Sequence, residues 1–438
     1  MSNLISDLAQ NLWRHCDHVD EHAAPLDMDM DVDLAVIGGG FTGCAAALEA
    51  ARMGAKVAVI EAHTVGHGGS GRNVGLVNAG VWLLPETVQK QLGPIAAKRL
   101  LSAFSTGPEQ VFDLIAREEI SCEVSRTGTV HLAHAPAAVV ELHDRQRQSA
   151  QTGRQLEILS AAQTRQITGS QLFHSGLYDP GAGTIQPLAY VRGLARAAQR
   201  RGAYIFQHSP VTRFKSGRDG WRLTVRGHQL RADKLLIATN AYHEGFDDPQ
   251  PPKFVPISYS QFATAPLSAD LLQTVLPTLA GCWDTALVMS SFRLDQAGRL
   301  ILGAIGNLHG ACGRIHHDWA RRKLAQIFPQ LAGQRFQHNW RGTIAMTRDH
   351  LPKILSIGHN AYRVFGYSGR GICPGTLFGT ALAEALLIDS TAPLPLLPTR
   401  SHTEPYARLR GRYYETGATA IHALSPAPWS RPPRSEPK

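Results

Sequence analysis

Long apolar runs and paired cysteines are both missing from this chain of 438 residues. No stretch reaches the roughly 18 consecutive apolar residues of a membrane-spanning helix, so we expect no transmembrane segment. The six cysteines are scattered, with no C-x-x-C pair and no His/Cys cluster. This spacing argues against a structural zinc site and a disulfide framework. The N-terminus shows no basic stretch followed by an apolar one, so we expect no signal peptide and a cytoplasmic protein.

Charge is also sparse, since only 18% of the residues are charged, although the formal net charge is +9. Basic residues are spread along the whole chain, whereas a nucleic-acid-binding protein gathers them into a patch. We therefore expect no nucleic-acid partner and relate the basic balance to an anionic cofactor. His316 and His317 lack the spacing of metal ligands, so we expect them in a surface loop and expect no metal site.

The clearest motif is the run D-L-A-V-I-G-G-G-F-T-G, which begins at Asp33. An apolar strand leads into three spaced glycines and then into an Ala-rich helix, which is the pattern of a dinucleotide site. Gly38 allows the tight turn, Gly40 lets the backbone approach a pyrophosphate, and Gly43 lets helix and strand pack closely. The second apolar strand ends at Glu61, which is placed to accept a hydrogen bond from a ribose 2′-hydroxyl. The motif therefore predicts a site for FAD or NAD.

The rest of the chain suggests an α/β protein with several segments. Residues 1–30 form an arm with a short amphipathic piece around Leu4 to Trp13, which we expect on the surface. A mostly helical pattern follows from Pro94 to about Glu157, and residues 252–345 are rich in strands. The tail from Ser425 is rich in Pro, Ser and Arg and is expected to be disordered.

A second glycine-rich loop, G-Y-S-G-R-G, stands far away in the sequence at 366–371, just before an apolar helix. Two distant backbone loops suit a cofactor whose ends are held by different parts of the chain, as with FAD. Together with further motifs, the chain resembles the D-amino-acid oxidase superfamily of flavoproteins, in its γ-glutamylputrescine, sarcosine and glycine oxidase branch. The further motifs are S-G-R-N at 70–73, the strand at 255–267, F-R-L-D-Q-A-G-R-L-I-L-G at 292–303, and T-R-D-H-L-P at 347–352.

The resemblance implies a Rossmann-type FAD-binding domain that is discontinuous, with a substrate domain on a mixed or antiparallel sheet. We expect the FAD-binding domain at 31–90, 183–250 and 345–395, the substrate domain at 91–182 and 251–344, and a C-terminal segment with the tail at 396–438. The implied cofactor contacts are Gly38, Gly40, Phe41, Thr42, Gly43, Glu61, Ala62, Ser70, Gly71, Arg72, Asn73, Val211, Ala238, Thr239, Asn240, Gly366, Gly369, Arg370, Gly371 and Cys373.

Two departures from the relatives affect the expected substrate and cofactor linkage. Relatives often carry His where this chain has Arg370, and sarcosine oxidases carry a substrate-binding Lys where we place Cys373, so a simple N-methylglycine substrate is disfavoured. Sarcosine oxidases also attach flavin through a cysteine near the position that we align with Thr343. This chain has no cysteine there, so we expect non-covalent FAD.

The resemblance implies oxidative deamination or dealkylation of an amine or amino acid, with hydride transfer to flavin N5, imine hydrolysis and reoxidation by O₂ to peroxide. The flavin carries out the redox step, so the protein's task is to bind and orient the substrate and to tune the flavin. We expect functional roles for Arg72 and Arg370 as charges near the flavin and for Tyr259 as a hydrogen-bond partner. The alternatives are exposed arginines and a core tyrosine. For Trp82 and Asn78, core packing competes with a place in the pocket wall, and Asp349 and His350 suit a turn.

Three other functions remain open from the sequence. The nearest is a dehydrogenase of the same fold that passes electrons to a quinone or a partner protein. An NAD-dependent dehydrogenase explains residues 38–61 but leaves the second glycine loop without a role. A tRNA-modifying flavoprotein accounts for the net charge of +9.

Overall fold

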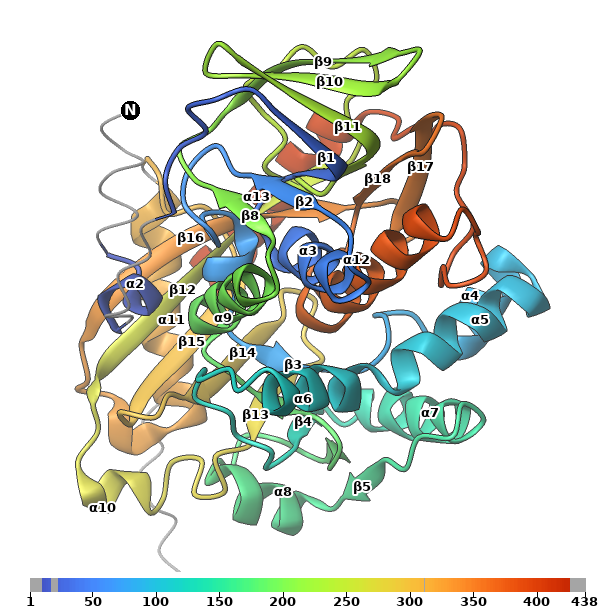
Figure 1. The fold of residues 1–438 in the computed structure, drawn as a ribbon. Helices are drawn as coiled ribbons and strands as arrows, with labels where there is room; N and C mark the ends of the chain where they lie inside the picture. Colours follow the sequence, from blue (N-terminus) through green and yellow to red (C-terminus); the bar gives the residue numbers. More distant parts are fainter. Residues whose placement is uncertain (1–9, 17–22, 311, 426–438) are drawn as a thin grey trace, which may run out of the picture.

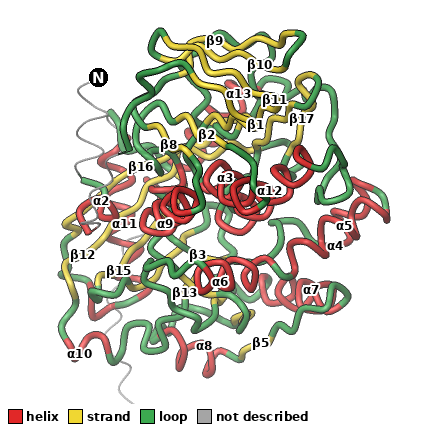
Figure 2. Tube along the Cα trace, viewed as in Figure 1, coloured by secondary structure: helices red, strands yellow, loops and turns green. Residues whose placement is uncertain are grey.

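The computed structural model describes residues 10–16, 23–310 and 312–425. Two eight-stranded sheets dominate the fold, and a two-stranded ribbon of β3 (Leu76–Val77) and β7 (Gly183–Thr184) lies near their junction (Figure 1). The helices α3 (Phe41–Arg52), α9 (Pro187–Arg200) and α12 (Ile372–Leu387) lie beneath the upper sheet, between it and the lower part of the molecule (Figures 1 and 2). The expected α/β fold with sheets of mixed orientation is confirmed.

The first sheet has the strand order β17-β18-β11-β1-β2-β8. Its central strand β1 pairs in parallel with both β11 and β2, and its apolar run Leu34–Ile37 is buried. A strand buried on both faces needs cover on both sides. The helices α3, α9 and α12 cover one face and the hairpin β9–β10 packs toward the other. The bounds are β1 (Met30–Ile37), β2 (Val57–Ile60), β8 (Tyr204–Phe206), β9 (Val211–Gly217), β10 (Gly220–Val225), β11 (His228–Ile237), β17 (Lys353–Gly358) and β18 (Ala361–Phe365).

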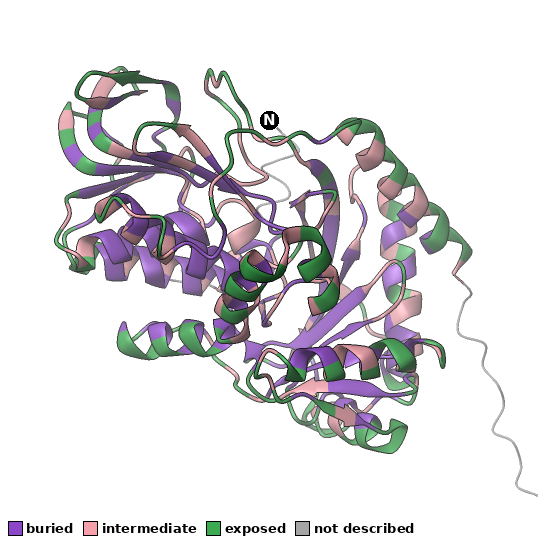
Figure 3. Cartoon of the chain, turned by 90° about the vertical axis from the view of Figure 1, so that its right-hand side faces the viewer, coloured by how far each residue is buried: buried purple, intermediate pink, exposed green. Residues whose placement is uncertain are grey.

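Glycines allow unusually close packing between the N-terminal and C-terminal parts of the chain. A Cβ at Gly43 in α3 would lie 1.9 Å from the Gly38 carbonyl oxygen, so only glycine fits the predicted close approach of helix and strand. On α12, a Cβ at Gly379 would lie 2.3 Å from the Thr42 carbonyl oxygen. The two helices therefore touch through their backbones, and Figure 3 shows this region as a buried layer beneath the sheet.

The second sheet has the strand order β16-β12-β15-β14-β13-β4-β6-β5. All its neighbours are antiparallel except β13 and β4, which run parallel. The outer face packs on α11 and α13. The bounds are β4 (Thr129–Leu132), β5 (Glu157–Leu159), β6 (Gly176–Asp179), β12 (Val255–Pro266), β13 (Gly281–Asp284), β14 (Ser290–Leu294), β15 (Arg299–Ile305), β16 (Phe336–Met346), α11 (Cys312–Ile327) and α13 (Ala407–Leu424).

The remaining helices include a group that flanks the second sheet on the side of β4. In Figure 1, α4, α5 and α7 lie toward the right, and α6 lies near the lower centre. Their bounds, with those of the other short helices, are α2 (Leu12–Cys16), α4 (Pro85–Leu92), α5 (Pro94–Ser105), α6 (Gly107–Arg117), α7 (Ala138–Ala150), α8 (Ala161–Thr168), α10 (Ala269–Leu272), η1 (Gly69–Gly71) and η2 (Pro329–Leu331).

Four expectations differ from the observed elements. His316 and His317 lie in helix α11 and not in a surface loop, and His316 is buried. The stretch expected to be mostly helical also contains strand β4, because its apolar residues 129–132 complete the second sheet. The C-terminal segment holds an 18-residue helix, α13, that the sequence did not suggest. In the arm, Leu12 and Trp13 are buried, since Trp13 packs edge-on against Trp340 and its Nε1 donates to the Asn73 carbonyl. The expected tail lies almost wholly outside the described residues, as does half of the arm.

The strands of the first sheet fall in the segments expected to bind FAD, and those of the second fall in the substrate segments apart from the end of β16. The division into two domains itself remains a prediction. The six cysteines, all within the described residues, form no disulfide bond. Among the described residues, no helix combines the length and apolar character needed to cross a membrane, and no group of three or more acidic, His or Cys side chains is suited to hold a metal.

Candidate active site

A cavity of about 500 Å³ lies between the first sheet and the second sheet. Such a volume is typical of cofactor and ligand sites. Its walls come from the loop after β1, the end of β2, the loop 67–78, residues 238–246, strands β12 to β16, and residues 367–374. The cavity therefore brings together the two glycine-rich loops that are more than 300 residues apart in the sequence.

The first glycine loop forms one end of this cavity. Gly38, with φ of +108°, adopts a conformation that disfavours other residues, and a Cβ there would meet the Ala238 carbonyl at 3.0 Å. The Glu61 carboxylate accepts hydrogen bonds from the backbone N–H groups of Gly39, at 2.7 Å, and His63, at 2.9 Å. Burial raises the pKa of this carboxyl group. Glu61 thus stands at the cavity wall with its orientation fixed by the backbone.

The expected loop 70–73 is divided between the cavity wall and the protein interior. Ser70 and Asn73 line the cavity, and the Ser70 Oγ accepts from the Phe41 backbone N–H at 3.0 Å. Gly71 and Arg72 are not among the lining residues. The Arg72 guanidinium donates to the carbonyls of His67, at 2.8 Å, and Arg341, at 3.3 Å. Through these contacts the buried Arg72 holds the loop, so the alternative of an exposed arginine does not apply, and its expected position beside the flavin ring stays a prediction.

Most of the other expected cofactor contacts do line the cavity. These lining residues are Gly38, Gly40, Phe41, Thr42, Glu61, Ala62, Val211, Ala238, Thr239, Asn240, Gly369, Arg370, Gly371 and Cys373. Gly43 and Gly366 do not line it, and each has a structural reason to be glycine. Gly43 allows α3 to pack on Gly38, and Gly366 takes a φ of +85° while its N–H donates to the Asn240 side chain at 2.9 Å.

The second glycine loop closes the opposite wall and leads into α12. The Tyr367 hydroxyl and the Thr42 hydroxyl are hydrogen-bonded at 2.7 Å, which ties this loop directly to the first. Helix α12 begins at Ile372, and its first turn, including Cys373 and Pro374, borders the cavity. The N-terminus of a helix carries partial positive charge and free N–H groups. This wall can therefore stabilise negative charge on a bound group.

The wall formed by the second sheet is aromatic and amide-rich. Tyr259 and Gln261 are two residues apart on β12, so both face the cavity. The Tyr259 hydroxyl and the Gln261 Oε1 are buried and have no hydrogen-bond partner in the protein. Buried polar atoms are normally paired, so these two atoms are available to a ligand. Burial also raises the pKa of Tyr259 well above its usual value, which keeps it protonated.

Arg370 lies between two tryptophans of this region. Its guanidinium is 4.4 Å from the Trp82 ring centroid and 5.5 Å from that of Trp283, and its Nη1 donates to the Ala79 carbonyl at 2.6 Å. Trp82 is itself fixed, since its Nε1 donates to the Ser368 carbonyl at 2.6 Å. The expected alternative of an exposed arginine thus does not apply to Arg370. Trp82 and Asn78 both line the cavity.

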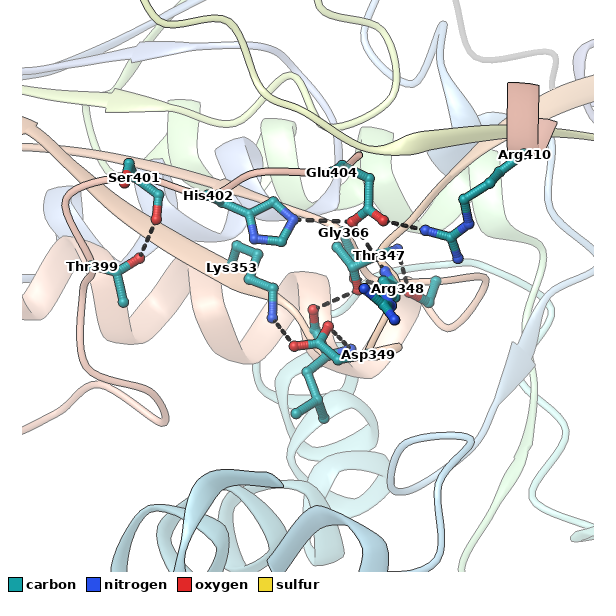
Figure 4. Close-up of polar contacts among 12 residues, drawn as sticks. Thr347, Arg348, Asp349, Lys353, Gly366, Thr399, Ser401, His402, Glu404 and Arg410 are labelled. Carbon is teal, nitrogen blue, oxygen red and sulfur yellow. Dashed lines mark hydrogen bonds and ion pairs between the residues drawn. The ribbon is translucent and has the colours of Figure 1, made fainter. Parts of the chain in front are cut away.

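The T-R-D-H-L-P segment combines a turn with one cavity residue. Asp349 pairs with Lys353, and the Thr347 hydroxyl donates to the Leu351 carbonyl at 2.9 Å (Figure 4). The buried Glu404 accepts from the Arg348 N–H at 3.0 Å and pairs with Arg410, which ties the turn to the C-terminal segment. His350 lines the cavity with a φ of +55°. The contacts of Asp349 thus agree with the turn role.

Several lining residues were not among the expected site residues. The Tyr242 ring lies against Gly68, and its hydroxyl oxygen accepts a hydrogen bond from the Thr343 backbone N–H at 2.9 Å. Gln261 could have been found by the period of two from Tyr259. His67, Trp283 and Tyr367 reach the cavity only through tertiary packing.

The lining residues fit a dinucleotide of the FAD type. A Cβ at Gly40 would lie 3.0 Å from the Ser70 Oγ, so the glycine keeps the backbone accessible between the two loops. The carboxylate of Glu61 suits a ribose hydroxyl, the glycine loop and the start of α3 suit a pyrophosphate, and the start of α12 suits the electron-accepting ring. The cavity continues past this cradle to Tyr259, Gln261 and Trp283, where a substrate has room.

Comparisons with known proteins agree with this geometry. The family model described as DAO, FAD dependent oxidoreductase, matches residues 33–385. Gamma-glutamylputrescine oxidoreductase of Escherichia coli is 30% identical over 403 residues, covering 89% of this chain and 93% of the relative. Glycine oxidase of Geobacillus kaustophilus is 23% identical over 379 residues, covering 82% of this chain and 94% of the relative.

Solved structures show the same fold. The crystal structure of glycine oxidase from Geobacillus kaustophilus superposes with a TM-score of 0.69 at 19% identity, covering 85% of this chain and all of the other. L-Proline dehydrogenase from P. horikoshii gives a TM-score of 0.69 at 18% identity, covering 84% and 96%. With the two glycine loops closing one cavity and a family match over most of the chain, this protein belongs to the DAO family of FAD-dependent oxidoreductases.

Proposed function

We propose that this protein oxidises the C–N bond of an amine or amino acid and uses O₂ as the electron acceptor. The observation that carries the proposal is the composition of the cavity beyond the FAD cradle. Its walls there present Trp82, Trp283, Tyr259 and Gln261, which bind and orient a substrate but do not exchange protons readily near neutral pH. The two named relatives supply the substrate class, since one acts on γ-glutamylputrescine and the other on glycine by name.

The distribution of acidic groups supports a redox reaction over hydrolysis. Among the described lining residues, the acidic ones are Glu61 and Glu244, and both lie next to His63 at the glycine-loop end. The other end therefore has no carboxylate to act as a general base. FAD, when bound, takes up the two electrons and the hydrogen that leave the substrate carbon. The protein's own part is to hold the substrate dry and correctly oriented.

We assign roles to individual residues from their unpaired polar atoms and from their positions around the cavity. The Tyr259 hydroxyl and the Gln261 amide, both lacking protein partners, would hydrogen-bond the substrate or the flavin edge. The first turn of α12 would stabilise negative charge on the reduced cofactor. Arg370 would add positive charge at the same wall. Arg72 would hold the loop 67–73 in place through its bonds to the carbonyls of His67 and Arg341.

Anaerobic reduction of the flavin tests the substrate class. The purified holoenzyme would be mixed without oxygen with primary amines, N-methyl amino acids, cyclic imino acids and γ-glutamyl amines, while flavin absorbance is followed. Bleaching by one of these classes supports the proposal. Bleaching by hydroxy acids alone, with none of the amines active, contradicts it.

The electron acceptor is tested with the substrate found in this way. Oxygen consumption with stoichiometric peroxide supports an oxidase. Rapid reduction of an artificial dye without oxygen consumption would favour a dehydrogenase of the same fold. The similar fold of L-proline dehydrogenase is the reason to include this test.

A further inference from the structure

The segment 71–74, which begins at the end of η1, has each of its four backbone carbonyls bound by a side chain from elsewhere in the chain. The four hydrogen bonds run from Asn11 Nδ2 to the Gly71 oxygen at 2.9 Å, from Trp340 Nε1 to the Arg72 oxygen at 2.8 Å, from Trp13 Nε1 to the Asn73 oxygen at 2.9 Å, and from Arg293 Nε to the Val74 oxygen at 2.7 Å. Asn73 and Val74 line the large cavity, whereas none of the four donor residues does. Side chains outside the cavity therefore fix this part of its wall.

The four donors come from three separate parts of the chain. Asn11 and Trp13 belong to the N-terminal arm, Arg293 to β14 and Trp340 to β16. All four residues are buried, with 1% or 2% of their surface exposed. Water cannot readily replace a donor in such a place, and a buried carbonyl without a donor is unfavourable. Removing one donor therefore favours a different arrangement of the segment.

The donors also orient one another. The Trp13 ring packs edge-on against the Trp340 ring with centroids 5.8 Å apart, and the Arg293 guanidinium lies 5.1 Å from a Trp13 ring centroid. The Trp13 backbone N–H donates to the Asn11 Oδ1 at 3.0 Å. Burial lowers the pKa of Arg293 to about 10, so it is still charged at neutral pH and makes a charge-assisted hydrogen bond. We call Asn11, Trp13, Arg293 and Trp340 the clamp.

The clamped segment is coupled to the first glycine loop. The Asn73 Nδ2 donates to the carbonyls of Gly69, at 2.9 Å, and Ser70, at 3.0 Å. The Ser70 Oγ in turn accepts from the Phe41 backbone N–H at 3.0 Å, at the start of α3. A fixed Asn73 thus helps to fix Ser70 against the place that suits a pyrophosphate. A site that is already ordered binds its ligand more tightly, because binding does not have to order it.

We propose that the clamp positions residues 70–74 for FAD, so that Asn11 and Trp13 of the N-terminal arm are positioning residues of the cofactor site. The family model matches residues 33–385 and does not include the arm. The clamp acts through the segment that it holds, since its own side chains do not line the cavity. Loss of one donor lowers the fraction of apoprotein in which this segment is arranged for FAD, and the apparent dissociation constant rises in inverse proportion.

Titration of the apoprotein with FAD, followed by flavin fluorescence, tests the clamp. Trp13→Phe and Trp340→Phe each keep an aromatic ring but remove one indole N–H donor. We expect each variant to bind FAD about tenfold more weakly, because a buried carbonyl of the segment loses its hydrogen bond. Asn11→Ala removes a third donor with a smaller loss of side-chain volume, and it supplies the same test if a tryptophan variant does not fold.

Trp221→Phe is the matched control. Trp221 on β10 is also buried, and its Nε1 donates to the His359 carbonyl at 3.0 Å, but it does not line the cavity or contact the clamped segment. This variant should lower the melting temperature of the apoprotein, as the other tryptophan variants do, and keep the parental FAD affinity. Melting and titration together thus separate a general loss of stability from a loss of cofactor binding.

The double variant Trp13→Phe/Trp340→Phe tests whether the two donors hold one segment. A segment that is already released by one substitution has less to lose by the second. The loss of FAD affinity in the double variant should therefore be smaller than the product of the two single losses.

Three results would overturn the proposal. They are parental FAD affinity in folded Trp13→Phe and Trp340→Phe, an equal loss of affinity in Trp221→Phe, and single losses that simply multiply in the double variant. None of these measurements uses a substrate. A failed amine screen would therefore remove the proposed reaction and leave the clamp standing.

Discussion

The substitution Gly43→Ala probes the point where the FAD-binding motif is packed most tightly. The added Cβ would stand 1.9 Å from the Gly38 carbonyl oxygen and 3.2 Å from the Val36 Cγ1. Ordinary contacts of this kind lie near 3.4 Å or beyond, so helix and strand would have to separate by more than an ångström. The obstructing atom is backbone and belongs to the pyrophosphate turn, so no side chain can rotate away.

Overpacking of a core costs about 1–3 kcal/mol, and a backbone clash of this size belongs at the upper end. We expect Gly43→Ala to lose about 3 kcal/mol of unfolding free energy and to bind FAD at least tenfold more weakly, because Gly38 sits in the cofactor loop. Differential scanning fluorimetry of the apoprotein measures the first effect. Fluorescence titration of the apoprotein with FAD measures the second.

Gly417→Ala is the matched control, because Gly417 lies within helix α13 and a Cβ there meets no atom within 4 Å. Alanine is favoured over glycine in a helix by about 1 kcal/mol, so this variant should be as stable as the parent or more so. A Gly43→Ala protein with parental melting temperature and parental FAD affinity would refute the packing argument.

Four further outcomes are expected. Glu61→Gln should weaken FAD binding about tenfold in a titration of the apoprotein. The Glu61 carboxylate has two oxygens that accept from the Gly39 and His63 N–H groups, whereas the amide has one oxygen, which is also a weaker acceptor for a ribose hydroxyl. Tyr259→Phe should leave the melting temperature unchanged or raised, since the hydroxyl has no protein partner, while kcat/KM for the amine found in the screen falls about tenfold; a normal kcat/KM would exclude the proposed contact. The pKa of His422 is lowered to about 3 by burial and by His316, Arg322 and Lys323, so stability is lost as pH falls below the unfolded value of about 6.5. His422→Gln should therefore reduce the loss of unfolding free energy between pH 7 and 5.5 by about 1 kcal/mol in urea melts. Acid precipitation should release all of the yellow FAD into the supernatant, and colour retained in the pellet would show a covalent flavin.

The sequence predicts the first half of the site well because its signals are local. Gly38, Gly40, Gly43 and Glu61 fall within one strand-helix-strand unit, where spacing and backbone conformation follow from neighbouring residues. The structure places Gly38, Gly40 and Glu61 at the cavity and Gly43 at the predicted helix contact. The second glycine loop is also visible locally, as G-Y-S-G-R-G before an apolar helix, but its position opposite the first depends on the hydrogen bond between Tyr367 and Thr42.

The remainder depends on contacts between residues far apart in the chain. Arg370 reaches the Ala79 carbonyl across 291 positions, and no local pattern marks such a pair. Arg72 makes a similarly distant contact, since its guanidinium donates to the Arg341 carbonyl across 269 positions as well as to the His67 carbonyl. Helix α13 was missed because Gly411 and Gly417 disfavour a helix locally. Gly411 is required by packing, since a Cβ there would lie 2.9 Å from the Pro256 carbonyl oxygen.

The backbone contact between α3 and α12 has a consequence for how the protein is made. The ribosome releases Thr42 first, and its partner Gly379 leaves 337 residues later. The strand β18, which flanks β11 in the first sheet, is equally late. During translation the dinucleotide motif therefore exists without its covering helix, and the cofactor cradle is completed only after residues 372–387 have been synthesised. A fragment that stops before residue 372 would lack α12 and should fail to retain FAD, however complete its glycine motif.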